Sequence, residues 1–84
     1  MSADDAIGAL ERLGLSNYEA RVFVALQRLG TGTAEAVSEV SDVPRSQVYG
    51  AADDLGSRGL VEVIESSPKE YRPGSLSTAR EQLS

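Results

Sequence analysis

The chain has 84 residues, of which 40% are hydrophobic and 25% charged, a composition typical of one small globular domain. It contains no cysteine and no histidine, which excludes disulfides, thiolate or imidazole metal ligands and histidine acid–base chemistry. A metal site built from carboxylates alone is still compatible with this composition. No apolar run approaches the ~20 residues of a membrane span, and the acidic N-terminus is unlike a signal peptide. We expect a cytoplasmic protein with no membrane contact and no cofactor.

The charge is negative and unevenly distributed. The chain has 13 acidic and 8 basic residues, a net charge of −5, and its only lysine is Lys69. Residues 1–43 carry 3 basic and 7 acidic side chains, whereas residues 44–84 carry 5 and 6. A surface that binds a polyanion must therefore lie in the second half. The acidic, lysine-poor composition favours a halophilic origin, with an ordinary acidic mesophilic domain as the alternative.

Two helices are predicted at the start of the chain. The first spans about residues 4–13 and stops at Gly14. The second begins with a capping box, in which the Ser16 hydroxyl accepts from the amide of Glu19 and the Glu19 carboxylate accepts in return, and it ends at Gly30. The apolar residues expected to face the core are Ile7, Leu10 and Leu13 in the first helix and Tyr18, Val22, Phe23, Leu26 and Leu29 in the second.

A third helix is predicted after a short turn at residues 31–33. Thr33 can cap this helix, which spans about residues 34–41, and Val37 and Val40 are expected to point inward. The helix is followed by a connection so short that only a tight helix–helix turn fits it.

The fourth helix spans about residues 44–58. Pro44 suits its first position, where the missing amide costs nothing, and Gly59 suits its end. Two helices joined by a tight turn, the second opened by proline, are the pattern of a helix-turn-helix.

The period of the sequence changes after Gly59. Residues 60–73 alternate around turn chemistry at residues 66–68, which predicts a two-stranded β-hairpin. We interpret residues 1–74 as a winged helix-turn-helix domain, mainly α in an α+β class, and residues 75–84 as the start of a linker or dimerisation helix. The apolar stripe of that last helix is Leu76, Ala79 and Leu83.

The helix over residues 44–58 has an inward and an outward face. At 100° per residue the inward residues are Val48, Ala51, Ala52 and Leu55. Outward or flanking are Ser46, Gln47, Tyr49, Gly50, Asp53, Asp54 and Ser57, with Arg45 in the first turn.

This outward face predicts a DNA-reading surface. Arg45 and Gln47 carry the side chains best matched to guanine and adenine edges, and Ser46 lies between them. An ordinary solvated helix start is the alternative, which the neighbouring turn and hairpin make less favoured. Tyr49 suits packing beside the turn or a phosphate contact. Gly50 makes the helix about 1 kcal/mol less favourable than alanine would. Close approach of DNA to the main chain would explain a glycine here, and so would neutral drift.

The hairpin adds two cations, Lys69 and Arg72, which we expect close to its tip. There they can reach the phosphate backbone or the minor groove of DNA. Charges on edge strands also serve only to prevent strand pairing, which is the alternative here.

Catalytic functions find no support in the sequence. Asp53 and Asp54 are adjacent on a helix, so their side chains diverge by about 100° and cannot share a proton. The segment 30–33 lacks the lysine and the spacing of a phosphate-binding loop, and no histidine activates a serine. We do not expect an enzyme.

Four segments resemble the DNA-binding domain of the TrmB family of archaeal transcriptional regulators. They are LGLSNYEARVF (13–23), VPRSQVY (43–49), GLVEV (59–63) and PKEYRP (68–73). The resemblance implies an N-terminal winged helix, a linker helix that pairs two subunits and, in many members, a larger C-terminal domain that senses sugars. It also implies that Arg45, Ser46, Gln47 and Tyr49 face the operator while Lys69 and Arg72 belong to the wing.

This sequence departs from the family in two respects. It stops at Ser84, so an effector-sensing domain is absent from it, and residues 50–54 are lighter and more acidic than the family's recognition helix. We predict sequence-specific binding to double-stranded DNA by a TrmB-like regulator acting as a homodimer. The recognition helix 44–58 would enter the major groove and the hairpin 60–73 would lie on the backbone or in the minor groove. The alternative is a winged helix that binds proteins and not DNA, which the net negative charge favours.

Overall fold

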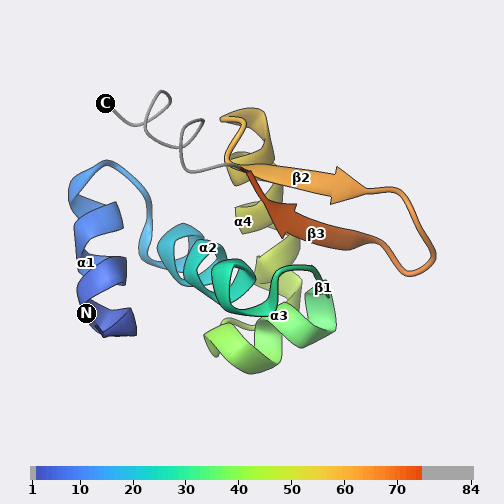
Figure 1. Ribbon diagram of the computed structural model, residues 1–84, viewed down its shortest axis with the longest axis horizontal. Coiled ribbons are helices and arrows are strands. Elements are labelled where there is room, and N and C mark those ends of the chain that lie inside the picture. The colour runs from blue at the N-terminus through green and yellow to red at the C-terminus, as the bar shows by residue number, and fades with distance from the viewer. Residues whose placement is uncertain (1, 75–84) are drawn as a thin grey trace.

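Helices and a small sheet alternate along residues 2–74, the part of the chain that the computed structural model describes. The helices pack together at one end of this region, and the hairpin of β2 and β3 extends beyond them at the end opposite α1 (Figure 1). In chain order the elements are α1 (Ala3–Arg12), α2 (Asn17–Leu29), β1 (Gly32–Thr33), α3 (Ala34–Ser41), α4 (Arg45–Ser57), β2 (Val61–Ile64) and β3 (Glu70–Pro73). The predicted winged helix-turn-helix and its α+β class are confirmed.

The helix starts follow from local hydrogen bonds. The predicted capping box of α2 is present: the Ser16 hydroxyl accepts from the Glu19 amide at 3.1 Å, and the Glu19 carboxylate accepts from the Ser16 amide at 2.8 Å. The Thr33 hydroxyl likewise accepts from the Ala36 amide at 3.2 Å, which confirms Thr33 as the cap of α3.

The turn between α3 and α4 differs from prediction by one residue. Pro44 has an extended ψ of 137° and is the N-cap of α4, so Arg45, and not Pro44, is the first helical residue. The Pro44 carbonyl accepts the first helical bonds, from the amides of Gln47 at 2.8 Å and Val48 at 3.1 Å. Asp42 ends α3 in the left-handed conformation, with φ 60°, and this reverses the chain within the turn.

The core lies between α2, α4 and the hairpin. The predicted inward face of α4 is confirmed, because Val48, Ala51, Ala52 and Leu55 are all buried. They pack in one cluster with buried residues of α2 and with Leu60, Val61 and Tyr71 of the hairpin region. The hairpin is therefore tied to the helical part through its own apolar side chains.

Four residues predicted to face the core do not. Val40 is 41% exposed, because Ala34, Val37 and Ser41 form the buried stripe of α3 and Val40 lies about 90° from its centre. Leu13, Tyr18 and Leu29 are also exposed, and each lies at or directly beside an end of its helix.

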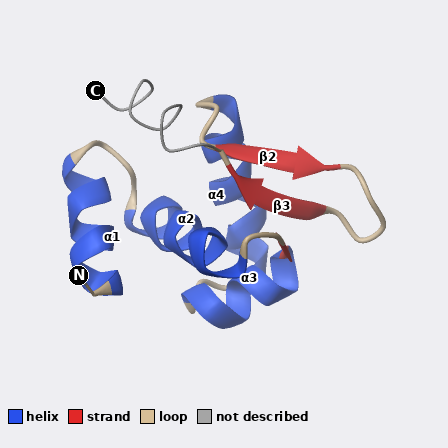
Figure 2. Cartoon of the chain, viewed as in Figure 1, coloured by secondary structure: helices blue, strands red, loops and turns tan. Residues whose placement is uncertain are grey.

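The sheet has a third strand that the sequence did not predict. Gly32 and Thr33, expected in a turn, pair with Tyr71 and Glu70, so the strand order is β1-β3-β2 and all neighbours are antiparallel. Figure 2 shows this short strand directly before α3. A Cβ at Gly32 would lie 3.0 Å from Leu29 Cδ1, the end of a flexible side chain, so a larger residue at this position would require Leu29 to shift.

The expected helix with Leu76, Ala79 and Leu83 lies outside the described residues. No helix within residues 2–74 is both long and apolar enough to span a lipid bilayer.

The folded state should lose stability at alkaline pH through Tyr71. Burial, followed by the charges of Asp53, Tyr49 and Glu65, raises the pKa of the Tyr71 phenol above its usual value of about 10. The folded chain thus holds this proton more tightly than the unfolded chain, and stability is complete below pH ~10 and falls as the pH rises above it. Urea unfolding at about pH 8 and about pH 11 should show a smaller alkaline loss for Tyr71→Phe than for the parent.

A phenol on the surface provides the control. Tyr18 is 39% exposed, and Tyr18→Phe should retain the parent's full alkaline loss. An equal loss in the parent and in Tyr71→Phe would contradict the role given to Tyr71.

Candidate nucleic-acid interface

The exposed face of α4 follows from its buried face. With Val48 and Leu55 held in the core, the helical period turns Arg45, Ser46, Gln47, Tyr49 and Gly50 outward, and all five are exposed. These are the α4 residues predicted for DNA contact. The helix divides them into two flanks, one on either side of Ser46.

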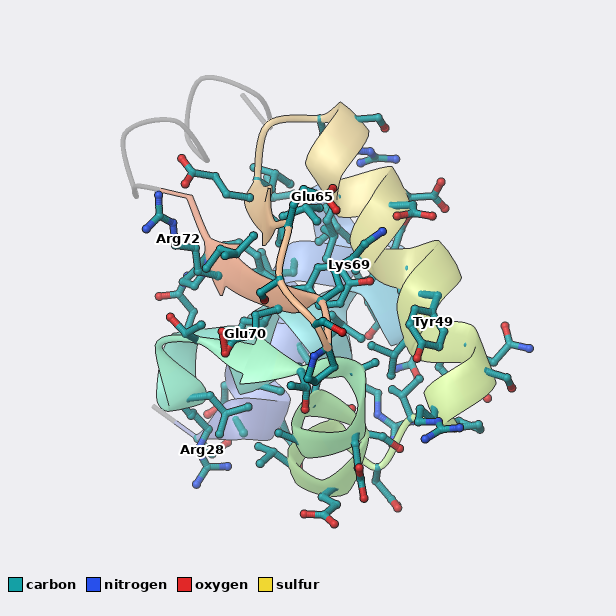
Figure 3. The ribbon with its side chains drawn as sticks, turned by 90° about the vertical axis from the view of Figure 1, so that its right-hand side faces the viewer. Arg28, Tyr49, Glu65, Lys69, Glu70 and Arg72 are labelled. Carbon is teal, nitrogen blue, oxygen red and sulfur yellow. The ribbon has the colours of Figure 1, made fainter. Side chains whose placement is uncertain are left out.

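One flank joins α4 to the wing. Arg45 and Tyr49 border a shallow hollow together with Thr33, Ala34 and Glu35 from the start of α3 and Pro68 and Lys69 from the hairpin loop. In Figure 3, Lys69 and Tyr49 lie on the same part of the surface, beside α4. The fold thus brings Arg45, Tyr49 and Lys69 together from segments that are far apart in the sequence.

The other flank faces the start of α2. Gln47, Gly50 and Asp54 border a second hollow with Ser16 and Tyr18. Its wall is the capped N-terminus of α2, where main-chain amides carry partial positive charge. Gln47 therefore lies on the opposite side of α4 from Lys69, and the predicted contact residues span the whole exposed width of the helix.

Gly50 is not required by the packing of α4. A Cβ at this position would meet nothing within 4 Å outside its own helix, and its backbone is not in the left-handed region. Because Gly50 has no side chain, the main chain of α4 is accessible on the flank that faces α2.

Arg72 lies elsewhere than predicted. It pairs in register with Glu62 near the base of the hairpin, one residue from the Val61–Pro73 pair, so its predicted position close to the tip is wrong. Its guanidinium donates from Nε to Glu62 Oε2 at 2.6 Å and forms an ion pair through Nη2. Both side chains are half exposed, and the pair adds little stability, but it neutralises the cation. Figure 3 places Arg72 on the other side of the hairpin from Tyr49.

One acidic side chain, Glu35, borders the first hollow together with Arg45 and Lys69. The charges of Asp53 and Glu65 contribute to the raised pKa of the nearby Tyr71 phenol. Within residues 2–74, no group of three acidic side chains has the geometry to hold a metal ion. The surface is therefore of mixed charge, with its positive groups at the first turn of α4 and in the hairpin loop.

Sequence reasoning missed the residues that complete the two hollows. Glu35 and Thr33 join the first and Ser16 and Tyr18 the second. The sequence suggested capping roles for Thr33 and Ser16, a core role for Tyr18 and no role for Glu35. No local signal could have found them, because each hollow forms where segments distant in the chain meet.

Comparison with known proteins assigns the family. The family model described as "Sugar-specific transcriptional regulator TrmB" matches residues 10–77. The chain belongs to the TrmB family. The resemblance noted in the sequence is thereby confirmed.

Two curated relatives come from Pyrococcus furiosus. The chain is 27% identical over 73 residues to the HTH-type sugar sensing transcriptional regulator TrmBL1, covering 87% of this chain and 21% of the relative. It is 34% identical over 74 residues to the putative HTH-type transcriptional regulator TrmBL2, covering 87% of this chain and 28% of the relative. The chain thus spans about a quarter of the length of these relatives.

A solved structure of TrmBL2 has the same fold. It is described as an archaeal chromatin protein with a novel mode of DNA binding, and it superposes with a TM-score of 0.89 at 28% identity. The match covers 96% of this chain and 33% of that one.

Replacing Gly50 by alanine should stabilise the fold. Alanine in the interior of a helix is favoured over glycine by up to about 1 kcal/mol, and there is space for its methyl group. Gly8→Ala in α1 is the matched control, since its Cβ would make only an ordinary contact of 3.8 Å with Arg12. Thermal unfolding should show both variants melting higher than the parent. A lower melting temperature for Gly50→Ala alone would mean that the packing of α4 needs this glycine.

Proposed function

We propose that this domain is the DNA-binding part of a TrmB-family transcriptional regulator and that it reads double-stranded DNA with α4. The observation that supports this most is the exposure of Arg45, Ser46 and Gln47 on the first turn of α4, with Lys69 of the wing beside them. A helix entering the major groove by its N-terminus presents these positions to base edges. The TrmBL2 structure, with DNA binding in its description, supports DNA binding as the function of this domain.

The start of α4 also suits a phosphate. Pro44 provides no side-chain cap, so the first amides of the helix are available to an external acceptor. Phosphate contacts here and at Lys69 would set the register of the domain on DNA, while Arg45 and Gln47 would read guanine and adenine. Ser46 and Tyr49 would contribute at the edge of the same surface. Because Arg72 is paired with Glu62, we expect it to contribute little to the contact with DNA.

The second candidate function is binding to another protein. It is favoured by the net charge of −5 and by the exposed carboxylates Asp53 and Asp54 in the C-terminal half of α4. If the affinity for a DNA duplex rises with the number of its bases that match a preferred sequence, protein binding is excluded as the main function. We expect no enzymatic activity, no cofactor and a cytoplasmic location, since regulators of this family act on the chromosome.

Mutation of the two cations should separate reading from anchoring. Arg45→Ala should cost about 1–3 kcal/mol of discrimination between preferred and random DNA, because a bidentate base contact is lost. Lys69→Ala should weaken binding to all sequences alike and reduce the salt slope of log K by about one. Fluorescence anisotropy with duplexes selected by the parent from a random library, at several salt concentrations, measures both effects.

Three further variants serve as controls for this prediction. Arg28→Ala removes an exposed cation in the last turn of α2, apart from Tyr49 and Lys69 in Figure 3, and should bind as the parent does. Gly50→Ala should weaken binding if DNA approaches the main chain closely, whereas Gly8→Ala should not. Parental binding by both Arg45→Ala and Lys69→Ala would show that the assigned surface is wrong.

We further propose that the protein acts as a homodimer. A winged helix in a two-fold dimer presents two reading helices about 34–36 Å apart to successive major grooves, and its site is pseudo-palindromic. The apolar stripe of residues 76–83 is the predicted pairing element. Analytical ultracentrifugation at high micromolar concentration, with and without DNA, should detect the dimer. A monomer under both conditions would contradict this.

We also propose an archaeal, halophilic origin, supported by the acidic, lysine-poor composition. Self-repulsion among 13 acidic groups opposes the compact state, and salt screens it. The melting temperature should therefore rise between about 0.1 M and about 2 M potassium chloride. The salt slope of DNA binding should be shallow, because screening of the protein's negative charge offsets counterion release. A melting temperature that stays constant or falls would contradict the halophilic origin.

A further inference from the structure

Arg21 on α2 is hydrogen-bonded to the turn that precedes α4. Its Nε donates to the carbonyl of Ser41 at 3.1 Å, and its Nη2 donates to the carbonyl of Asp42 at 3.1 Å. Both acceptors belong to the C-terminal end of α3, where carbonyls lack helical partners and carry partial negative charge. The last turn of α3 contains no basic residue of its own. The cation that this helix end favours is therefore supplied by another helix.

The guanidinium is held in this orientation from its other side. Nη1 donates to Asn17 Oδ1 at 3.3 Å, and the guanidinium carbon lies 5.9 Å from the centre of the Tyr18 ring. The side chain of Arg21 is only 26% exposed. Two donors directed at two successive carbonyls require the planar fork of arginine, which the ammonium group of lysine cannot reproduce.

The ion pair with Asp42 is a minor part of this arrangement. Nη2 lies 3.9 Å from Asp42 Oδ2, and the Asp42 side chain is fully exposed, so solvent screens the attraction. The main-chain contacts therefore account for most of the interaction.

The turn held by Arg21 sets the direction of α4. The Ser38 hydroxyl donates to the Val43 carbonyl at 2.6 Å, and the Ser41 hydroxyl accepts from the Val43 amide at 3.2 Å. Val43 itself is buried, and Arg45 follows after only one residue. Since Pro44 adds no side-chain cap, the angle at which α4 leaves the turn depends on these restraints and on its buried face.

We propose that Arg21 is a positioning residue for DNA reading: it holds the turn so that the first residues of α4 keep one orientation, without itself contacting DNA. This inference rests on the proposed function for its consequence in specificity. The alternative, a direct phosphate contact by Arg21, differs in its salt dependence and is an outcome of the test.

The test compares Arg21→Lys, which keeps the charge and loses the fork, with two controls. Asp42→Asn removes the ion pair but keeps the main-chain carbonyl and tolerates the left-handed backbone. Arg28→Lys makes the same chemical change at an exposed position of α2. Both controls should behave as the parent in all measurements.

The first measurement uses no DNA. Amide hydrogen exchange in the 84-residue chain should be about tenfold faster in Arg21→Lys at Gln47 and Val48, whose amides bond to Pro44, while the amides of Ala52 and Leu55 are unchanged. The second measures affinity for library-selected duplexes and for poly(dI-dC) between about 0.1 and 0.5 M salt. The ratio of the two affinities should fall about tenfold, with an unchanged salt slope for poly(dI-dC).

Each outcome decides the question. Unchanged exchange at Gln47 and Val48 in Arg21→Lys overturns the inference. A salt slope for poly(dI-dC) that falls by about one in Arg21→Ala, which removes the charge, overturns it as well, because it marks a lost phosphate contact. If the parent selects no sequence from the library, the proposed function fails, while the exchange measurement still decides whether Arg21 positions α4. If Arg21→Lys does not fold, Asn17→Ala should give a smaller change in the same direction, because it releases Nη1 of Arg21 and leaves both main-chain bonds of the guanidinium in place; it also removes the 3.5 Å bond from Asn17 Nδ2 to Glu11 Oε2.

Discussion

Every feature of the candidate interface depends on the burial of one narrow face of α4. Val48 and Leu55 lie fully in the core, and Ala51 and Ala52 between them allow α4 to pack closely. Burial of a valine or leucine side chain contributes about 1.5–3 kcal/mol each, a large fraction of the stability of so small a domain. A rotation of α4 about its axis would expose these residues, so the polar side chains of the helix have only one orientation available.

The wing is attached to this arrangement through Tyr71. Tyr71 lies in the central strand β3, pairs with Gly32 on one side and Val63 on the other, and is buried. It thereby joins the start of α3 and the hairpin to the core that α2 and α4 share. The hairpin loop with Lys69 is consequently presented next to Arg45 and Tyr49, although a hairpin of two strands alone would have marginal stability.

The electrostatics of the surface are local. The chain as a whole is acidic, and its acidic excess is concentrated in residues 1–43, which include α1 and α3. Salt shortens the range of these charges to about 8–10 Å under ordinary conditions, so the approach of an anion to α4 is governed by the groups nearest to it. There Arg45, Lys69 and the first amides of α4 compete with Glu35 and Asp53. Such a surface gains less from counterion release than a strongly basic one, and shape and direct base contacts carry a larger share of its recognition.

The sequence by itself determined the four helices, the hairpin and the inward face of α4. Capping residues such as Ser16 and Thr33 act within three residues of themselves, and the 3.6-residue period assigned Val48, Ala51, Ala52 and Leu55 to the core, so local physics was sufficient. The family resemblance, carried by short motifs, was also readable from the chain.

Tertiary structure alone decided which of these residues meet. Three of these meetings are pairings between segments about ten to forty residues apart: Gly32 with Tyr71, Arg72 with Glu62, and Arg21 with Ser41. The exposure of Val40 likewise depends on which elements pack against α3. Periodicity reports only which face of an element is apolar. Which neighbour covers that face, and which charge finds a partner, depends on how the elements pack, and this is a property of the whole fold.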